Sequence, residues 1–166
     1  MSPYIAIVKS RFNSFITDQL EAGAVKEFAR HGFHREQIEI IEVPGAFEIP
    51  ATVAALLRHR QFKAIVCVGA VIRGETSHFE YVCDACSRGI ADLSQKSPIP
   101  ITNGVLTVEN QEQALARCGI KGSNHGEQAA AAAVEMIKVF KKIRQPVTKK
   151  VEKEQREHGA SINSNT

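Results

Sequence analysis

The sequence lacks any long apolar run. A helix that crosses a membrane needs about 20 consecutive apolar residues, and no stretch of these 166 residues approaches that length. We therefore expect no membrane-spanning segment and no membrane partner. The first apolar residues, 5–8, follow no basic segment and precede no small-residue cleavage pattern, so we also expect no signal peptide and a cytoplasmic protein.

Cysteine is scarce, and its spacing favours neither disulfides nor a metal site. Cys67, Cys83, Cys86 and Cys118 lie in segments of regular periodicity without a secretory signal, which favours reduced thiols. Cys83 and Cys86 form a CxxC pair, but no second CxxC or HxxxH completes a tetrahedral set. We therefore predict no metal, and we interpret this pair as two small residues that face the core.

No basic face is evident within the body of the chain. The net charge is +3, but seven Lys and Arg against three Glu fall between Lys141 and the end, which leaves residues 1–140 near neutral. Nucleic-acid-binding domains normally carry a basic surface within the fold, so we predict no nucleic-acid partner. Residues 146–166 hold few apolar side chains and are predicted to form a disordered, basic polar tail behind a single domain at 1–145.

Short apolar runs alternate with longer segments of helical periodicity, as is typical of βαβ units around a parallel sheet. Helix 14–30 shows the pattern well, with an apolar face of Ile16, Leu20, Ala24 and Phe28 and a stop at Gly32. Ser77–Glu80 and Asn124–Glu127 resemble capping boxes, and the first of them puts His78 at the first helical position. The predicted strands are 5–9, 38–43, 64–71 and 98–108, and the other predicted helices begin near 50 and span 77–94, 109–117 and 124–140.

Unusual loops follow three consecutive predicted strands, at 11–13, 43–48 and 71–78. In an open parallel sheet the ligand crevice lies beyond the carboxyl ends of the strands. These loops should therefore meet at one edge and form the binding site.

Each candidate residue in these loops has a plainer alternative. His78 at a helix start would be held neutral and could act as a general base, or it could be an ordinary surface histidine. Gly74 to Ser77 could bind an anion with free backbone N–H groups, although every helix start exposes such groups. Phe12 could stack on a planar ring or belong to the core. Glu48 could cap its helix or accept hydroxyl groups of a polyol.

Four segments in the same order, 11–13, 43–50, 69–82 and 104–110, resemble the lumazine synthase family, and the likeness covers about residues 4–140. The resemblance implies a flavodoxin-like three-layer αβα sandwich with a four-stranded parallel sheet. It implies a transferase of riboflavin biosynthesis that needs no cofactor or metal. The expected assembly is a homopentamer with active sites shared between neighbouring subunits, and riboflavin synthase is a further partner that the family suggests.

The resemblance also implies roles for individual residues. By similarity, Phe12 stacks on a uracil ring, Glu48 holds ribityl hydroxyls, and His78 moves protons. Glu75 and Thr76 offer backbone donors to a sugar phosphate, which Arg117 of the next subunit would pair with. The backbone that reads the edges of the ring is expected at Ala46, Phe47, Ala70, Val71 and Ile72.

Two positions depart from the family pattern on the side that a neighbouring subunit would contribute. Asn103 stands where an aromatic residue is usual, and His125 stands where a lysine often occurs. A neutral histidine would attract phosphate less than lysine does. These departures keep open the alternative of a catalytically weak paralogue that binds riboflavin or lumazine. A flavodoxin-like electron carrier is a third alternative, which predicts a yellow cofactor on the purified protein.

Overall fold

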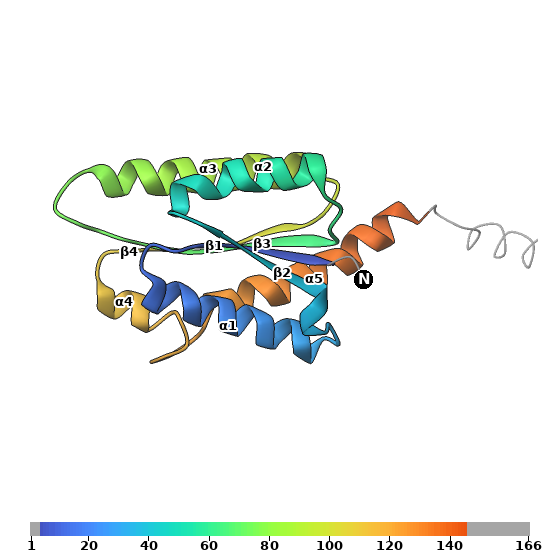
Figure 1. The fold of residues 1–166 in the computed structure, drawn as a ribbon, viewed down its shortest axis with the longest axis horizontal. Coiled ribbons are helices and arrows are strands. Elements are labelled where there is room, and N and C mark those ends of the chain that lie inside the picture. Colours follow the sequence, from blue (N-terminus) through green and yellow to red (C-terminus); the bar gives the residue numbers. More distant parts are fainter. Residues whose placement is uncertain (1–3, 146–166) are drawn as a thin grey trace, which may run out of the picture.

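A four-stranded parallel sheet forms the middle layer of the molecule (Figure 1), in the computed structural model that describes residues 4–145. Its strand order is β2-β1-β3-β4. The strands are β1 (Ile5–Ser10), β2 (Ile38–Val43), β3 (Ala64–Ile72) and β4 (Ile101–Val108). The helices are α1 (Ser14–Arg30), α2 (Ile49–His59), α3 (His78–Lys96), α4 (Gln111–Leu115) and α5 (His125–Arg144), with short 3-10 turns η1 (Arg35–Gln37) and η2 (Ala46–Glu48).

Helices cover both faces of the sheet. α2 and α3 lie on one face, and α1, α4 and α5 lie on the other (Figure 1). Alternate residues of each strand point to opposite faces, so β1 sends Ile5 and Ile7 into one core cluster and Ala6 and Val8 into the other. All four are fully buried, as expected for a central strand covered on both sides. The predicted flavodoxin-like sandwich is confirmed.

The pattern that predicted α1 also specifies where this helix ends. Ile16, Leu20, Ala24 and Phe28 are fully buried. Gly32 adopts the left-handed φ of 82°, and the N–H of Phe33 donates to the Phe28 carbonyl at 3.1 Å. The Phe28 and Phe33 rings then meet edge to face at 5.5 Å. This arrangement is a Schellman cap with its usual apolar contact, and it satisfies carbonyls that the helix end would leave free.

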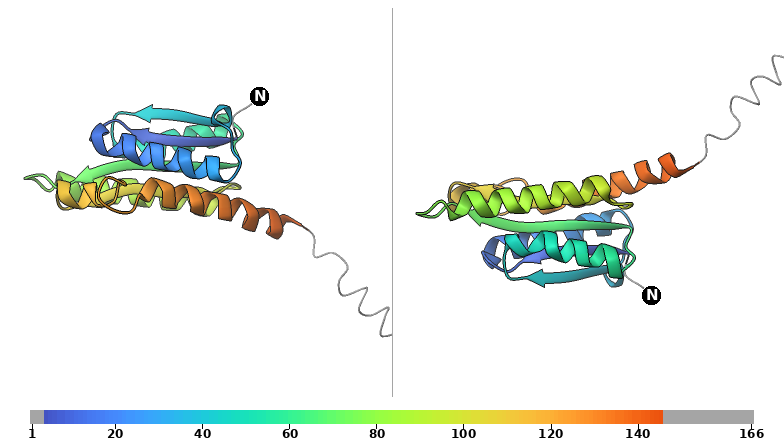
Figure 2. Two further views of the ribbon diagram at one scale, coloured as in Figure 1. Left: turned by 90° about the horizontal axis from the view of Figure 1, so that it is seen from below. Right: turned by 90° about the horizontal axis from the view of Figure 1, so that it is seen from above.

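α1 and α5 pack side by side (Figure 2), and two glycines let them approach closely. A Cβ at Gly126 would lie 1.9 Å from the Leu20 carbonyl oxygen, and one at Gly23 would lie 2.4 Å from the Asn124 side chain. The Nδ2 of Asn124 donates to the Gln19 carbonyl at 2.9 Å. The first turn of α5 is therefore held in a fixed position along the axis of α1.

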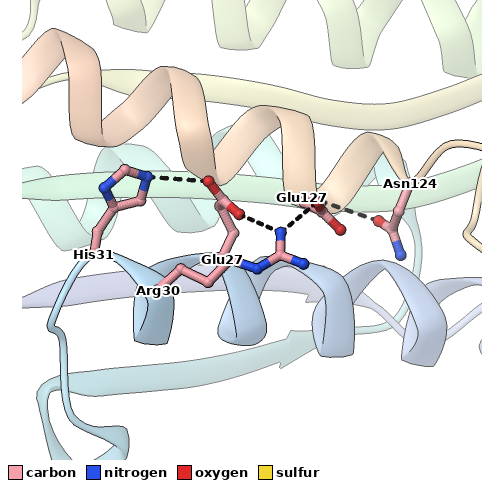
Figure 3. Close-up of polar contacts among 5 residues, drawn as sticks. All are labelled: Glu27, Arg30, His31, Asn124 and Glu127. Atoms are coloured by element: carbon pink, nitrogen blue, oxygen red, sulfur yellow. Dashed lines mark hydrogen bonds and ion pairs between the residues drawn. The ribbon is translucent and has the colours of Figure 1, made fainter.

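A network of polar side chains connects α1 and α5 (Figure 3). Arg30 contacts Glu27 at 2.9 Å and Glu127 at 2.6 Å, and so joins α1 to α5. His31 Nε2 lies 3.0 Å from the other oxygen of Glu27. The Arg30 guanidinium holds the pKa of the Glu27 carboxylate below its ordinary value.

The two predicted capping boxes have different outcomes. Asn124 caps α5 as expected, since its Oδ1 accepts the Glu127 N–H at 3.1 Å. The prediction of a capping box at Ser77 was wrong, because this residue has helical backbone angles and its side chain makes no capping hydrogen bond. The Glu80 carboxylate that should complete the box is paired with Arg73 instead. His78 is nevertheless the first residue of α3, as predicted.

Four further expectations concern the cysteines, a metal site, a membrane span and the chain end. All four cysteines are free thiols, and Cys86 faces the core whereas Cys83 is only half-buried. Burial raises the pKa of the Cys86 thiol to about 11. Within residues 4–145, no cluster of three His, Cys, Asp or Glu side chains is placed to hold a metal ion, and no helix has the length and apolarity of a membrane span. The predicted tail, 146–166, lies outside the described residues.

Candidate functional site

An open cavity of about 680 Å³ lies where β1, β2 and β3 end, between η2 and the start of α3. This is the left side of the sheet in Figure 1, and it is the edge where the sequence predicted a binding site. Most of the predicted site residues line it: Phe12, Ala46, Phe47, Glu48, Ala70, Val71, Ile72, Thr76 and His78. The cavity thus brings together residues from three separate loops.

The first loop presents Phe12 to the cavity. Beyond β1, the N–H of Arg11 donates to Val43 at 2.8 Å and that of Phe12 donates to Pro44 at 3.1 Å, so pairing with the β2 side continues past the strand. The Phe12 side chain is 71% exposed. The alternative that it belongs to the core is therefore wrong, and a ring so placed can stack on a planar ligand.

Asn13 holds this loop in place, a role that the sequence reasoning missed. It is the only non-glycine residue with positive φ in the described part of the chain, at 61°, and its Nδ2 donates to the Ala70 carbonyl at 2.9 Å. Asparagine is among the few residue types that tolerate this backbone region. An asparagine between a predicted strand and a predicted helix was the signal in the sequence that the chain could turn through this backbone region at residue 13.

The second loop supplies an aromatic side chain and a carboxylate. Phe47 is 60% exposed on the cavity, whereas Ala46 beside it is buried. The Glu48 carboxylate bends over Gly45, where a Cβ would lie only 3.2 Å from its Oε2. Glu48 occupies the N-cap position of α2 but makes no side-chain capping bond among the described residues. Its oxygens are therefore placed to accept hydroxyl groups of a ligand.

The third loop, residues 74–77, leads into α3 with His78 at its first position. Gly74, Thr76 and His78 line the cavity, whereas Glu75 is exposed outside it. The Thr76 hydroxyl accepts the His78 N–H at 3.4 Å. The loop therefore combines helix-start N–H groups, which attract anions, with an imidazole at the same rim.

Arg117 and His125 lie away from this cavity, on the other side of the sheet. They are neighbours in space, since the His125 N–H donates to the Arg117 carbonyl at 2.9 Å. Burial, and next the charge of Arg117, lowers the pKa of His125 below its ordinary value. Near pH 7 this half of the predicted site therefore holds one fixed positive charge rather than two.

Asn103 lies on the edge strand β4, and alternation along the strand places it on the same face of the sheet as Ile101 and Val105, which belong to the core cluster of α2 and α3. Its Oδ1 accepts the N–H of Val105 at 2.9 Å, so its side chain is folded back along the strand. The next residue, Gly104, lets α5 approach, because a Cβ there would lie 3.3 Å from the His125 carbonyl oxygen. Arg117 and His125 belong to the opposite face, beside α4 and at the start of α5 (Figure 1), and none of these three residues lines the cavity of the same chain.

This fold and cavity define a class of protein: an open parallel α/β sandwich with a cavity lined in part by aromatic side chains at the carboxyl ends of its strands, where such folds have their ligand crevice. The particular family follows from comparison with known families. Residues 2–141 match the family model described as 6,7-dimethyl-8-ribityllumazine synthase, and the chain belongs to this family. The resemblance seen in the four sequence motifs is confirmed. The family is one of transferases in riboflavin biosynthesis.

Proposed function

We propose that the protein condenses 5-amino-6-(D-ribitylamino)uracil with 3,4-dihydroxy-2-butanone 4-phosphate. The product would be 6,7-dimethyl-8-ribityllumazine, with release of phosphate and water. The observation that carries the proposal is the cavity itself. It brings the predicted stacking ring, hydroxyl acceptor and proton carrier, Phe12, Glu48 and His78, around one space in a chain of this family.

The ribitylaminouracil would occupy the aromatic part of the cavity. Phe12 would stack on its ring, and the backbone at the ends of η2 and β3 would hydrogen-bond to the ring edges. The Glu48 carboxylate can accept only, so it suits the donating hydroxyls of a ribityl chain. These contacts fix orientation, and orientation is much of what a condensation between two bound reactants needs.

His78 would serve the proton transfers. Imine formation, phosphate elimination and ring closure each move protons between nitrogen, carbon and oxygen. An imidazole can take and return a proton near neutral pH. The position of His78 at the cavity rim, beside the helix-start loop, supports this role.

The phosphate would lie between two subunits. Backbone N–H groups at Glu75 and Thr76 would bind it from one subunit, and Arg117 and His125 would approach from its neighbour in a homopentamer. Support comes from the placement of Arg117 and His125 outside the cavity of their own chain. A phosphate needs a fixed cation nearby, and Arg117 provides a planar donor for it.

A steady-state assay with the two substrates tests this proposal. Turnover at ordinary enzyme rates, on the order of 1 per second or faster, supports it. The second candidate is a carrier of riboflavin or lumazine, which the lowered pKa of His125 favours because it removes one cation from the phosphate side. Micromolar binding of riboflavin without turnover would establish the carrier and exclude the enzyme.

A further inference from the structure

Arg73, the residue directly after β3, contacts three different segments around the cavity rim. Its guanidinium pairs with Glu80 in the first turn of α3 and with Glu109 just after β4. Its Cζ lies 4.3 Å from the centre of the Phe79 ring, and its own N–H donates to the Val108 carbonyl at 3.0 Å. The side chain does not line the cavity.

The contact with Glu80 closes a short loop of chain. Arg73 precedes residues 74–77 and Glu80 follows them, so the ion pair ties together the two ends of the segment that leads to His78. Phe79 packs under the same guanidinium. The two residues that directly follow His78 in α3 are therefore both in contact with Arg73.

The contact with Glu109 leads in the other direction, to Arg117. The Glu109 N–H donates to the Gln113 side chain at 2.9 Å, and Arg117 donates to the Gln113 carbonyl at 3.0 Å. Gln113 is thus held by both, and its N–H is bonded to the Asn110 cap at 2.9 Å. A continuous set of polar contacts connects Arg73 to the residue that is expected to bind phosphate.

We propose that Arg73 is a positioning residue that holds the His78 loop through Glu80 and the Arg117 segment through Glu109. The inference rests on the proposed function, in which these two segments serve neighbouring active sites. One guanidinium can do this because its planar fork offers separate N–H groups to two carboxylates while its face packs on an aromatic ring. The ammonium of a lysine is a point charge and cannot reproduce all three contacts.

Steady-state kinetics of four variants test the proposal. Arg73→Gln should lower kcat/KM by about 10- to 100-fold, the scale of a misplaced reacting group. Glu80→Ala should mainly lower kcat, whereas Glu109→Ala should mainly raise KM for the phosphate substrate. Arg73→Lys should recover only part of the loss. Arg60→Gln is the matched control, since Arg60 also pairs with a carboxylate, at 2.6 Å, and lies 5.6 Å from a phenylalanine ring, far from the cavity loops.

Two results would overturn the proposal. One is an Arg73→Gln enzyme no slower than Arg60→Gln. The other is the same kinetic defect in Glu80→Ala and Glu109→Ala, which would show that the two contacts do not act on separate segments.

Amide hydrogen exchange separates this proposal from the proposed function. In Arg73→Gln, amides of residues 74–80 and 109–117 should exchange at least about fivefold faster, while those of β1 and β3 keep their protection. Unchanged exchange in both segments contradicts the proposal even if the wild-type protein turns over. Faster exchange in a protein without turnover would support the positioning role and refute the proposed reaction.

Discussion

Gly126, the second residue of α5, is the glycine at which an added methyl group should lower the stability of the fold most. In Gly126→Ala the new Cβ would lie 1.9 Å from the Leu20 carbonyl oxygen in the backbone of α1. A carbon and a carbonyl oxygen need roughly 3.3 Å between them. A helix backbone cannot swing aside as a flexible side chain can, so α5 must move away from α1 by about 1.4 Å to reach that distance.

The magnitude follows from what this movement breaks. Overpacking of a close contact costs about 1–3 kcal/mol. The bond from Asn124 to the Gln19 carbonyl is 2.9 Å long, and such a shift would break it at a further cost of about 1 kcal/mol. We therefore expect Gly126→Ala to lower the free energy of unfolding by about 2–4 kcal/mol.

Urea denaturation measures this change, with every variant at one protein concentration because any association of the chains would add to the apparent stability. Gly74→Ala is the control, since no atom lies within 4 Å of a Cβ at that position, and its change should stay within about 0.5 kcal/mol. A loss below about 1 kcal/mol in Gly126→Ala with an unchanged m-value would refute the close-packing argument.

Three further changes give direct readouts. Arg117→Ala should lower kcat/KM for the phosphate substrate by an amount that corresponds to about 2–4 kcal/mol, with little change in the affinity for the ribitylaminouracil. An equal loss of affinity for both substrates would contradict this. His78→Ala should slow turnover by roughly 10- to 10⁴-fold while substrate binding, followed by calorimetry, survives; unchanged turnover would remove His78 from the mechanism. Glu27 has its pKa lowered from 4.5, chiefly by Arg30, so its contribution to stability is complete above that value and is lost as the pH falls through the lowered pKa. In denaturant titrations from about pH 6 to about pH 3, Glu27→Gln should therefore lose less stability than the wild type, and parallel curves would exclude this role.

Local pattern accounts for much of the agreement between sequence and structure. The four-residue spacing of apolar side chains and the glycine at 32 predicted α1 to its observed bounds, Ser14–Arg30. The helix 109–117 was shorter than predicted, at Gln111–Leu115, because Asn110 caps it late and the chain then turns. The first three predicted strands agreed with the structure to within about one residue, because each apolar run ended at a polar or turn residue. The fourth was predicted at 98–108 but begins later, at Ile101.

Long-range choices between partners could not be predicted from local pattern. Glu80 has the spacing of a capping box with Ser77, yet its carboxylate pairs with Arg73, seven residues away, and the competing ion pair prevails. The second partner of Arg73, Glu109, is 36 residues away, and no periodicity connects such positions. The same reason explains why Asn13 was missed, since its contact with Ala70 depends on how β1 and β3 pair.

Mixed oligomers test most directly the central claim, that lumazine forms at a site built from two copies of the chain. His78→Ala and Arg117→Ala would each be assayed alone for their residual activity, and the two would then be coexpressed in equal amounts and assayed for lumazine formation. In a head-to-tail ring, random assembly puts an intact His78 opposite a neighbour's intact Arg117 in about one quarter of the sites. The account predicts recovery of about that fraction of wild-type turnover. A mixed preparation no more active than its two parents would contradict it.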